Sequence, residues 1–134
     1  MGLYDKLTGK ASEGANTALI EEYFLDDEVV LASFQYIRDM IIFTNLGIYL
    51  VDVQGITGRK IEVLFIPKRA VKSVAFETAG TVDLDSDVKL HVEGHFKKDE
   101  NGKFVLMPIL FKVPRQQQDK TKQIVNIVKT YYLA

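Results

Sequence analysis

The spacing of hydrophobic residues changes twice along the chain. Near the amino terminus, apolar positions recur every three or four residues, which predicts a helix over about residues 13–24. From Asp27 to Val113 the spacing is two, which is typical of half-buried strands. After Pro114 the spacing becomes helical again and predicts a helix with one apolar stripe, which consists of Ile124, Ile127, Val128 and Tyr131. Lys120, Lys122 and Lys129 lie off this stripe.

The central region divides into seven predicted strands separated by short polar or glycine-containing turns. Asn101-Gly102 predicts a type I′ hairpin turn, and Pro67 ends the fourth strand because proline has no N–H for a ladder. The expected strands cover about residues 30–36, 40–44, 48–53, 60–67, 71–78, 87–93 and 104–113. Seven antiparallel strands must protect their edges, and one terminal helix suits the open end of a barrel. We therefore expect a mainly β domain: a partly open antiparallel barrel over residues 27–134, capped by its C-terminal helix, with a short helical extension over residues 1–26.

Several predicted strands are apolar on both faces. Ile41 and Phe43 share one face while Met40 and Ile42 share the other, and residues 105–111 show the same pattern. A single-layer barrel wall should have one polar face, so the N-terminal helix, the C-terminal helix or a second subunit must cover the other. Pro108 fits an edge strand, where chains can join. The candidate self-association residues are Met40, Ile42, Val105, Met107, Ile109 and Phe111.

Composition narrows the function classes. The 134 residues include no cysteine, which excludes disulfides and thiolate metal sites, and the net charge of −1 argues against a nucleic-acid partner. The charge is unevenly distributed: residues 1–50 carry eight acidic and three basic residues, and residues 51–134 carry ten and fourteen. No apolar stretch reaches the roughly 20 residues of a membrane span, so we expect a cytoplasmic protein.

Two clusters carry candidate chemistry. His91, Glu93 and His95 alternate along one strand, and as a remote alternative they could bind a metal in a metal-dependent enzyme. However, neighbouring side chains on one face of a strand are about 7 Å apart, so a polar outer strand face explains these residues better. No nucleophile motif is present, so we expect no enzyme, no catalytic residue and no cofactor. A set of basic residues in two turns offers an alternative contact to anionic lipid or ligand: Arg59, Lys60, Lys68, Arg69 and Lys72.

Four motifs in order, Ile37 to Asn45, Val51 to Lys60, Ile66-Pro67 and Phe76 to Asp85, resemble the bacterial pleckstrin-homology-like (PH-like) family. The resemblance is close over roughly residues 25–95 and implies a seven-stranded PH-type barrel capped by a C-terminal helix. It also implies ring-forming or otherwise oligomeric proteins without an assigned reaction. One departure is the turn after Asn45, where Leu46-Gly47 replaces the basic pair that the family often carries.

The combined hypothesis is a non-enzymatic module that self-associates through outer strand faces or edges. The partner is expected to be a second copy of the chain, in a ring for example, or another protein. The opposed charges of the two segments favour head-to-tail contacts between copies, which is how rings close.

Overall fold

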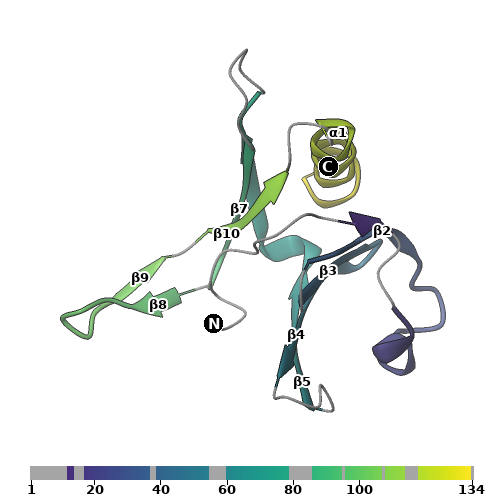
Figure 1. The fold of residues 1–134 in the computed structure, drawn as a ribbon, viewed down its shortest axis with the longest axis horizontal. Coiled ribbons are helices and arrows are strands. Elements are labelled where there is room, and N and C mark those ends of the chain that lie inside the picture. Colours follow the sequence, from purple (N-terminus) through teal and green to yellow (C-terminus); the bar gives the residue numbers. More distant parts are fainter. Residues whose placement is uncertain are drawn as a thin grey trace.

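The computed structural model describes residues 12–13, 17–36, 39–54, 60–78, 86–94, 96–106, 108–113 and 118–133. Within them the chain forms two antiparallel sheets, a separate hairpin and one C-terminal helix (Figure 1). The strands are β1 (Ser12–Glu13), β2 (Val30–Gln35), β3 (Asp39–Thr44), β4 (Gly47–Gln54), β5 (Lys60–Pro67), β6 (Val71–Phe76), β7 (Ser86–Val92), β8 (Phe96–Lys98), β9 (Phe104–Leu106) and β10 (Ile109–Val113). The helical elements are η1 (Thr17–Leu19), η2 (Glu21–Tyr23), η3 (Lys68–Ala70), α1 (Gln118–Ile127) and η5 (Val128–Tyr132).

The first sheet has the order β1-β2-β3-β4-β5 and the second the order β10-β7-β6. Seven of these strands, β2 to β7 and β10, form the predicted partly open barrel, and α1 covers its open side (Figure 1). The predicted fold class is therefore confirmed. The strand boundaries differ mainly at the seventh expected strand, which is divided into β9 and β10 because β9 pairs with β8 instead of joining the barrel.

The main core fills the space between the two sheets and the C-terminal helix. On the inward face of the first sheet, Ile41 pairs with Leu50 and Phe43 with Ile48, and all four side chains are fully buried. The rings of Phe43 and Tyr132 stack with centroids 6.5 Å apart, which joins the sheet to η5. Tyr36 ties the first sheet to β10 by donating its hydroxyl to the carbonyl of Lys112 at 3.1 Å.

The outward face of the same strands has its own small core. Met40 pairs with Val51 and Ile42 with Tyr49, and these side chains pack beneath Ile20, with Phe24 alongside. The two-sided apolarity of β3 and β4 thus reflects burial on both faces, and the N-terminal segment provides the outer cover.

That segment is not the continuous helix predicted over about residues 13–24. Its backbone bonds run from Ile20 to Thr17, Tyr23 to Ile20 and Phe24 to Glu21, all three residues apart, so η1 and η2 are separate 3₁₀ turns. Of the apolar positions at helical spacing, Ile20 and Phe24 face inward, whereas Leu19 and Tyr23 are 43% and 64% exposed. The spacing therefore predicted the apolar face of this segment only in part.

The C-terminal stripe also differs at its end. Ile124, Ile127 and Val128 are buried as predicted, but the next buried residue is Tyr132, while Tyr131 is 44% exposed. The amide of Leu133 bonds the carbonyl of Val128, five residues back, so the last turn is a wider π turn that moves the inward position by one residue. Lys120, expected off the stripe, is buried, and its ammonium lies 5.7 Å from the centroid of the Phe34 ring.

No helix among the described residues is long and apolar enough to cross a membrane.

Candidate functional site

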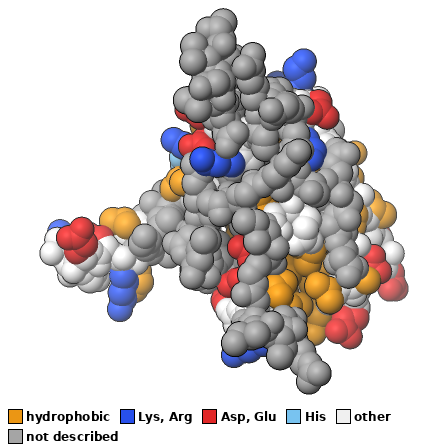
Figure 2. Space-filling model, viewed as in Figure 1, with side chains coloured by type: hydrophobic (Ala, Val, Ile, Leu, Met, Phe, Trp, Pro, Cys, Tyr) orange, Lys and Arg blue, Asp and Glu red, His pale blue; other side chains and the backbone are white. Residues whose placement is uncertain are grey.

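An apolar groove lies between β5 and the segment that follows η2. It has a volume of about 890 Å³, and Figure 2 shows hydrophobic side chains gathered on this face, between β4–β5 and the η1–η2 turns. Its lining residues are Tyr23, Leu25, Glu28, Leu46, Tyr49, Ile61, Val63, Phe65, Pro67, Lys68 and Arg69. Apolar clefts of this size with a few polar groups are typical of small-molecule sites.

The wall of the groove is built on an aromatic cluster. The Tyr49 ring lies 5.3 Å from that of Phe24 and 4.7 Å from that of Phe65, centroid to centroid. Ile61, Val63 and Phe65 alternate along β5 and so share the face that borders the groove. Phe65 is 39% exposed because the groove leaves one side of its ring uncovered.

Glu28 is a buried carboxylate at the edge of this groove. It accepts hydrogen bonds from the hydroxyl of Thr44 at 2.8 Å, the hydroxyl of Tyr49 at 3.1 Å and the amide of Leu25 at 3.1 Å. Burial, together with the bond to Glu28 and its negative charge, raises the pKa of Tyr49 to about 12. Glu28 therefore connects three segments of the wall through hydrogen bonds, and Tyr49 is the donor in one of them.

The turn between β3 and β4 supports the same wall. Asn45 accepts from the amide of Val29 at 2.7 Å and donates to the carbonyl of Asp27 at 3.1 Å. A side chain at Gly47 would collide with the backbone carbonyl oxygen of Ile66 and approach the Phe65 ring to 2.9 Å. Thr44 and Asn45 of the motif, together with Gly47 in the turn that follows, thus fix the approach of residues 27–29 and of β5, while Leu46 lines the groove.

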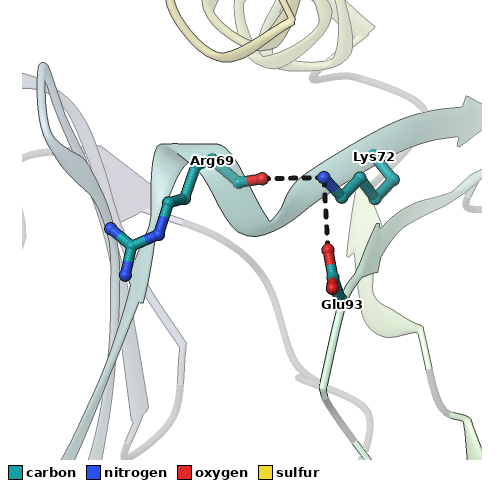
Figure 3. A network of polar contacts seen from close by, with 3 residues as sticks. All are labelled: Arg69, Lys72 and Glu93. Carbon is teal, nitrogen blue, oxygen red and sulfur yellow. Dashed lines mark hydrogen bonds and ion pairs between the residues drawn. The ribbon is translucent and has the colours of Figure 1, made fainter.

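The five candidate anionic-ligand residues do not form one patch. Lys68 and Arg69 lie together at the groove, whereas Lys60 begins β5 opposite Gln54, at the far end of that strand from Pro67. Lys72 donates to the backbone carbonyl of Arg69 at 3.0 Å and forms an ion pair with Glu93 at 3.2 Å; Figure 3 shows the Arg69 guanidinium pointing away from both. Arg59 lies outside the described residues. Of the four described members of this set, Lys68 and Arg69 alone line the groove, where one ligand could contact both.

The two described residues of the remote metal-site alternative, His91 and Glu93, have other polar partners. His91 shares a hydrogen bond of 3.0 Å with the hydroxyl of Ser73, and Glu93 pairs with Lys72. His95 lies outside the described residues, and within the described part of the chain no three candidate ligands cluster around a metal position.

The candidate self-association residues lie in different environments. Met40 and Ile42 are buried under Ile20 of the same chain, and Ile109 is buried in the main core, so these three are not surface residues. Val105 is 42% exposed on β9. Met107 and the side chain of Phe111 lie outside the described part of the chain.

The β8–β9 hairpin projects away from the barrel (Figure 1). It forms a separate two-stranded sheet, and among the hairpin side chains that the structure describes the most exposed apolar one is Phe104, at 69%. The Asn101-Gly102 position of the turn was predicted correctly, but the turn type differs: Gly102 donates to the carbonyl of Asp99 and adopts φ +78°, and Lys103 pairs with Asp99. This is a three-residue loop with glycine in the left-handed position.

No local sequence pattern marks Glu28, Thr44 and Tyr49 as a cluster. Glu28 was hidden in the acidic run Asp26-Asp27-Glu28, where a charged residue normally faces solvent. Thr44 and Asn45 did stand inside a recognisable motif, and that motif was the available signal for a structured turn.

Two open antiparallel sheets with a capping C-terminal helix define a PH-like domain. A family model described as "Bacterial PH domain" matches residues 2–113, and the chain belongs to this family. It is 42% identical over 112 residues to the "Uncharacterized protein YjqA" of Bacillus subtilis (strain 168), covering 75% of this chain and 90% of that protein.

Solved structures agree with this assignment. A DUF1696 family protein with a pleckstrin-homology domain from Shewanella loihica PV-4 has a TM-score of 0.69 and 29% identity, covering 93% of this chain and 99% of that one. A pleckstrin homology domain from Shewanella amazonensis SB2B has a TM-score of 0.61 and 27% identity, covering 88% and 86%. A PH-domain-containing protein from Exiguobacterium sibiricum 255-15, 23% identical with a TM-score of 0.66, shares the fold over 94% of this chain and 62% of that one.

Proposed function

We propose that this bacterial PH domain is a non-enzymatic assembly module that self-associates, with the β8–β9 hairpin as its main contact. The observation that carries the proposal is the exposure of Phe104 on a hairpin that pairs only with itself among the described residues. A two-stranded hairpin is marginally stable alone in water, so packing against a second copy would stabilise it.

The strand edges offer further contact area. In the described part of the chain β10 and β6 are the outer strands of the second sheet, and Phe76 on β6 is 49% exposed. Unpaired edges with apolar side chains favour addition of another chain. The opposed charges of residues 1–50 and 51–134 favour head-to-tail contacts, so assembly should weaken as salt rises.

The test is the native mass of the full chain by light scattering coupled to size exclusion, at tens of micromolar. The expected mass is a multiple of that of one chain. Phe104→Ser should shift the distribution to smaller species. Tyr23→Ser, at a residue 64% exposed on η2, is the matched control and should leave the mass unchanged. A mass of one chain for the unmodified protein overturns the proposal.

A further inference from the structure

The groove between β5 and the η2 segment combines an apolar wall with two cations at one end. Ile61, Val63 and Phe65 follow β5 for most of its length, and the chain then passes through Pro67 into η3, where Lys68 and Arg69 lie. Both cations are exposed, and neither side chain has an ion-pair partner among the described residues. Lys72, three residues after Arg69, is by contrast paired with Glu93.

The groove lining also contains a carboxylate, that of Glu28, but it does not serve as the anion for Lys68 and Arg69. Glu28 is only 8% exposed, and three donors from Leu25, Thr44 and Tyr49 already engage it. The unpaired positive charge at the rim therefore remains available to an anion from solution.

The dimensions indicate what kind of anion fits. From Ile61 to Pro67 the strand extends about 20 Å, and the groove holds about 890 Å³. An inorganic anion would contact the two cations and leave the apolar wall exposed to water. We propose that the groove binds a single-chain amphiphile with a terminal carboxylate, its chain along Ile61, Val63 and Phe65 and its carboxylate at Lys68 and Arg69. This site is separate from the hairpin and does not depend on self-association.

Titration calorimetry of the full chain with octanoate, decanoate and dodecanoate, each below its micelle concentration, tests the proposal. Burial of the chain should raise the affinity by roughly fourfold per methylene. Dodecyltrimethylammonium, which has the same tail and the opposite charge, should bind at least about tenfold more weakly than dodecanoate. Affinity that is independent of chain length, or equal for the two head groups, overturns the proposal.

Matched variants locate the site. Leu25→Glu places a negative charge in the groove, at a side chain that is 64% exposed. Leu19→Glu places the same charge outside the groove, at a side chain that is 43% exposed. Leu25→Glu should abolish dodecanoate binding and Leu19→Glu should not. Lys68→Gln with Arg69→Gln should weaken dodecanoate about three- to tenfold, whereas Lys60→Gln should leave it unchanged. Full affinity in Leu25→Glu overturns the assignment, provided circular dichroism shows that the variant is folded.

Sedimentation with vesicles distinguishes binding of a single-chain ligand from binding to a membrane surface. Sedimentation with phosphatidylglycerol vesicles should leave the protein in the supernatant. Co-sedimentation that is lost in the Lys68→Gln, Arg69→Gln variant would assign the two cations to a bilayer and overturn the single-chain ligand.

Discussion

The hydroxyl oxygen of Tyr132 lies 2.8 Å from the carbonyl oxygen of Thr44 and also 2.8 Å from that of Gly47. The last turn of the C-terminal helix is therefore bonded to the turn between β3 and β4, 88 residues earlier in the chain. Burial of the hydroxyl raises the pKa of Tyr132, because the charged phenolate is poorly solvated there.

Tyr132→Phe tests the strength of this link. The variant keeps the ring stacked on Phe43 but removes the one hydroxyl donor that these two buried carbonyls share, which should lower the free energy of unfolding by about 1–3 kcal/mol. Tyr131→Phe is the control, since Tyr131 is 44% exposed, and should change it by less than about 0.5 kcal/mol. Urea denaturation of both variants gives the comparison. Equal midpoints would show that the bond contributes nothing to stability.

Gly47 is required for steric reasons, and comparison with Gly94 distinguishes this steric effect from backbone strain. Gly47→Ala would drive a Cβ into the backbone carbonyl of Ile66, which cannot move aside without disturbing the β4–β5 pairing. We expect a loss of about 3 kcal/mol, at the upper end for overpacking. Gly94, with φ +82° and open space around it, isolates the conformational penalty, and Gly94→Ala should cost about 1–2 kcal/mol. The reverse order in thermal or urea unfolding would contradict the steric explanation.

The sequence predicted the barrel because β2 to β5 are short apolar runs whose side chains alternate between the two faces of a strand, and each run ends at a glycine, proline or polar turn. Ile41 and Phe43 facing one core and Met40 and Ile42 facing another follow directly from that alternation. What covers the second face depends on where the N-terminal segment folds back, a long-range contact that no local pattern encodes. The candidate groove was missed for the same reason, since Leu25, Leu46 and Phe65 come from three separate segments.

Alkaline pH should destabilise the fold through its buried tyrosines. The pKa of Tyr49 is raised to about 12 in the fold from about 10 in the unfolded chain. The native state therefore holds this proton more tightly, and the stability that it contributes is complete below pH 10 and is lost as the pH rises from about 10 to 12.

Tyr49→Phe isolates this contribution. At pH 8 the variant should be less stable by about 1–3 kcal/mol, because Glu28 loses a donor. Between pH 10 and 11 its stability should fall less steeply than that of the unmodified protein, by up to about 1.4 kcal/mol per pH unit. Urea unfolding at pH 8, 10 and 11 measures both effects, and identical slopes would show that the pKa of Tyr49 is the same in the folded and unfolded states.

Asp99 controls the shape of the β8–β9 hairpin. Its carboxylate accepts from the amides of Asn101 and Lys103, each at 2.9 Å, and its own amide bonds the carbonyl of Lys103 at 2.8 Å. Asp99→Ala should loosen the loop and speed amide exchange in β8 and β9. The barrel does not depend on this loop, so the free energy of unfolding should change by less than about 0.5 kcal/mol.

The same variant separates hairpin order from barrel stability in self-association. If the hairpin is the contact, Asp99→Ala should reduce the native mass while Glu100→Ala, an exposed neighbour in the same loop, should not. In Asp99→Ala, association must first order the β8–β9 hairpin, which is already ordered in the unmodified protein. The variant should therefore associate more weakly without a matching loss in the free energy of unfolding. An unchanged mass together with faster exchange in β8–β9 would mean that copies meet elsewhere, and the edges of β10 and β6 would become the surfaces to mutate next.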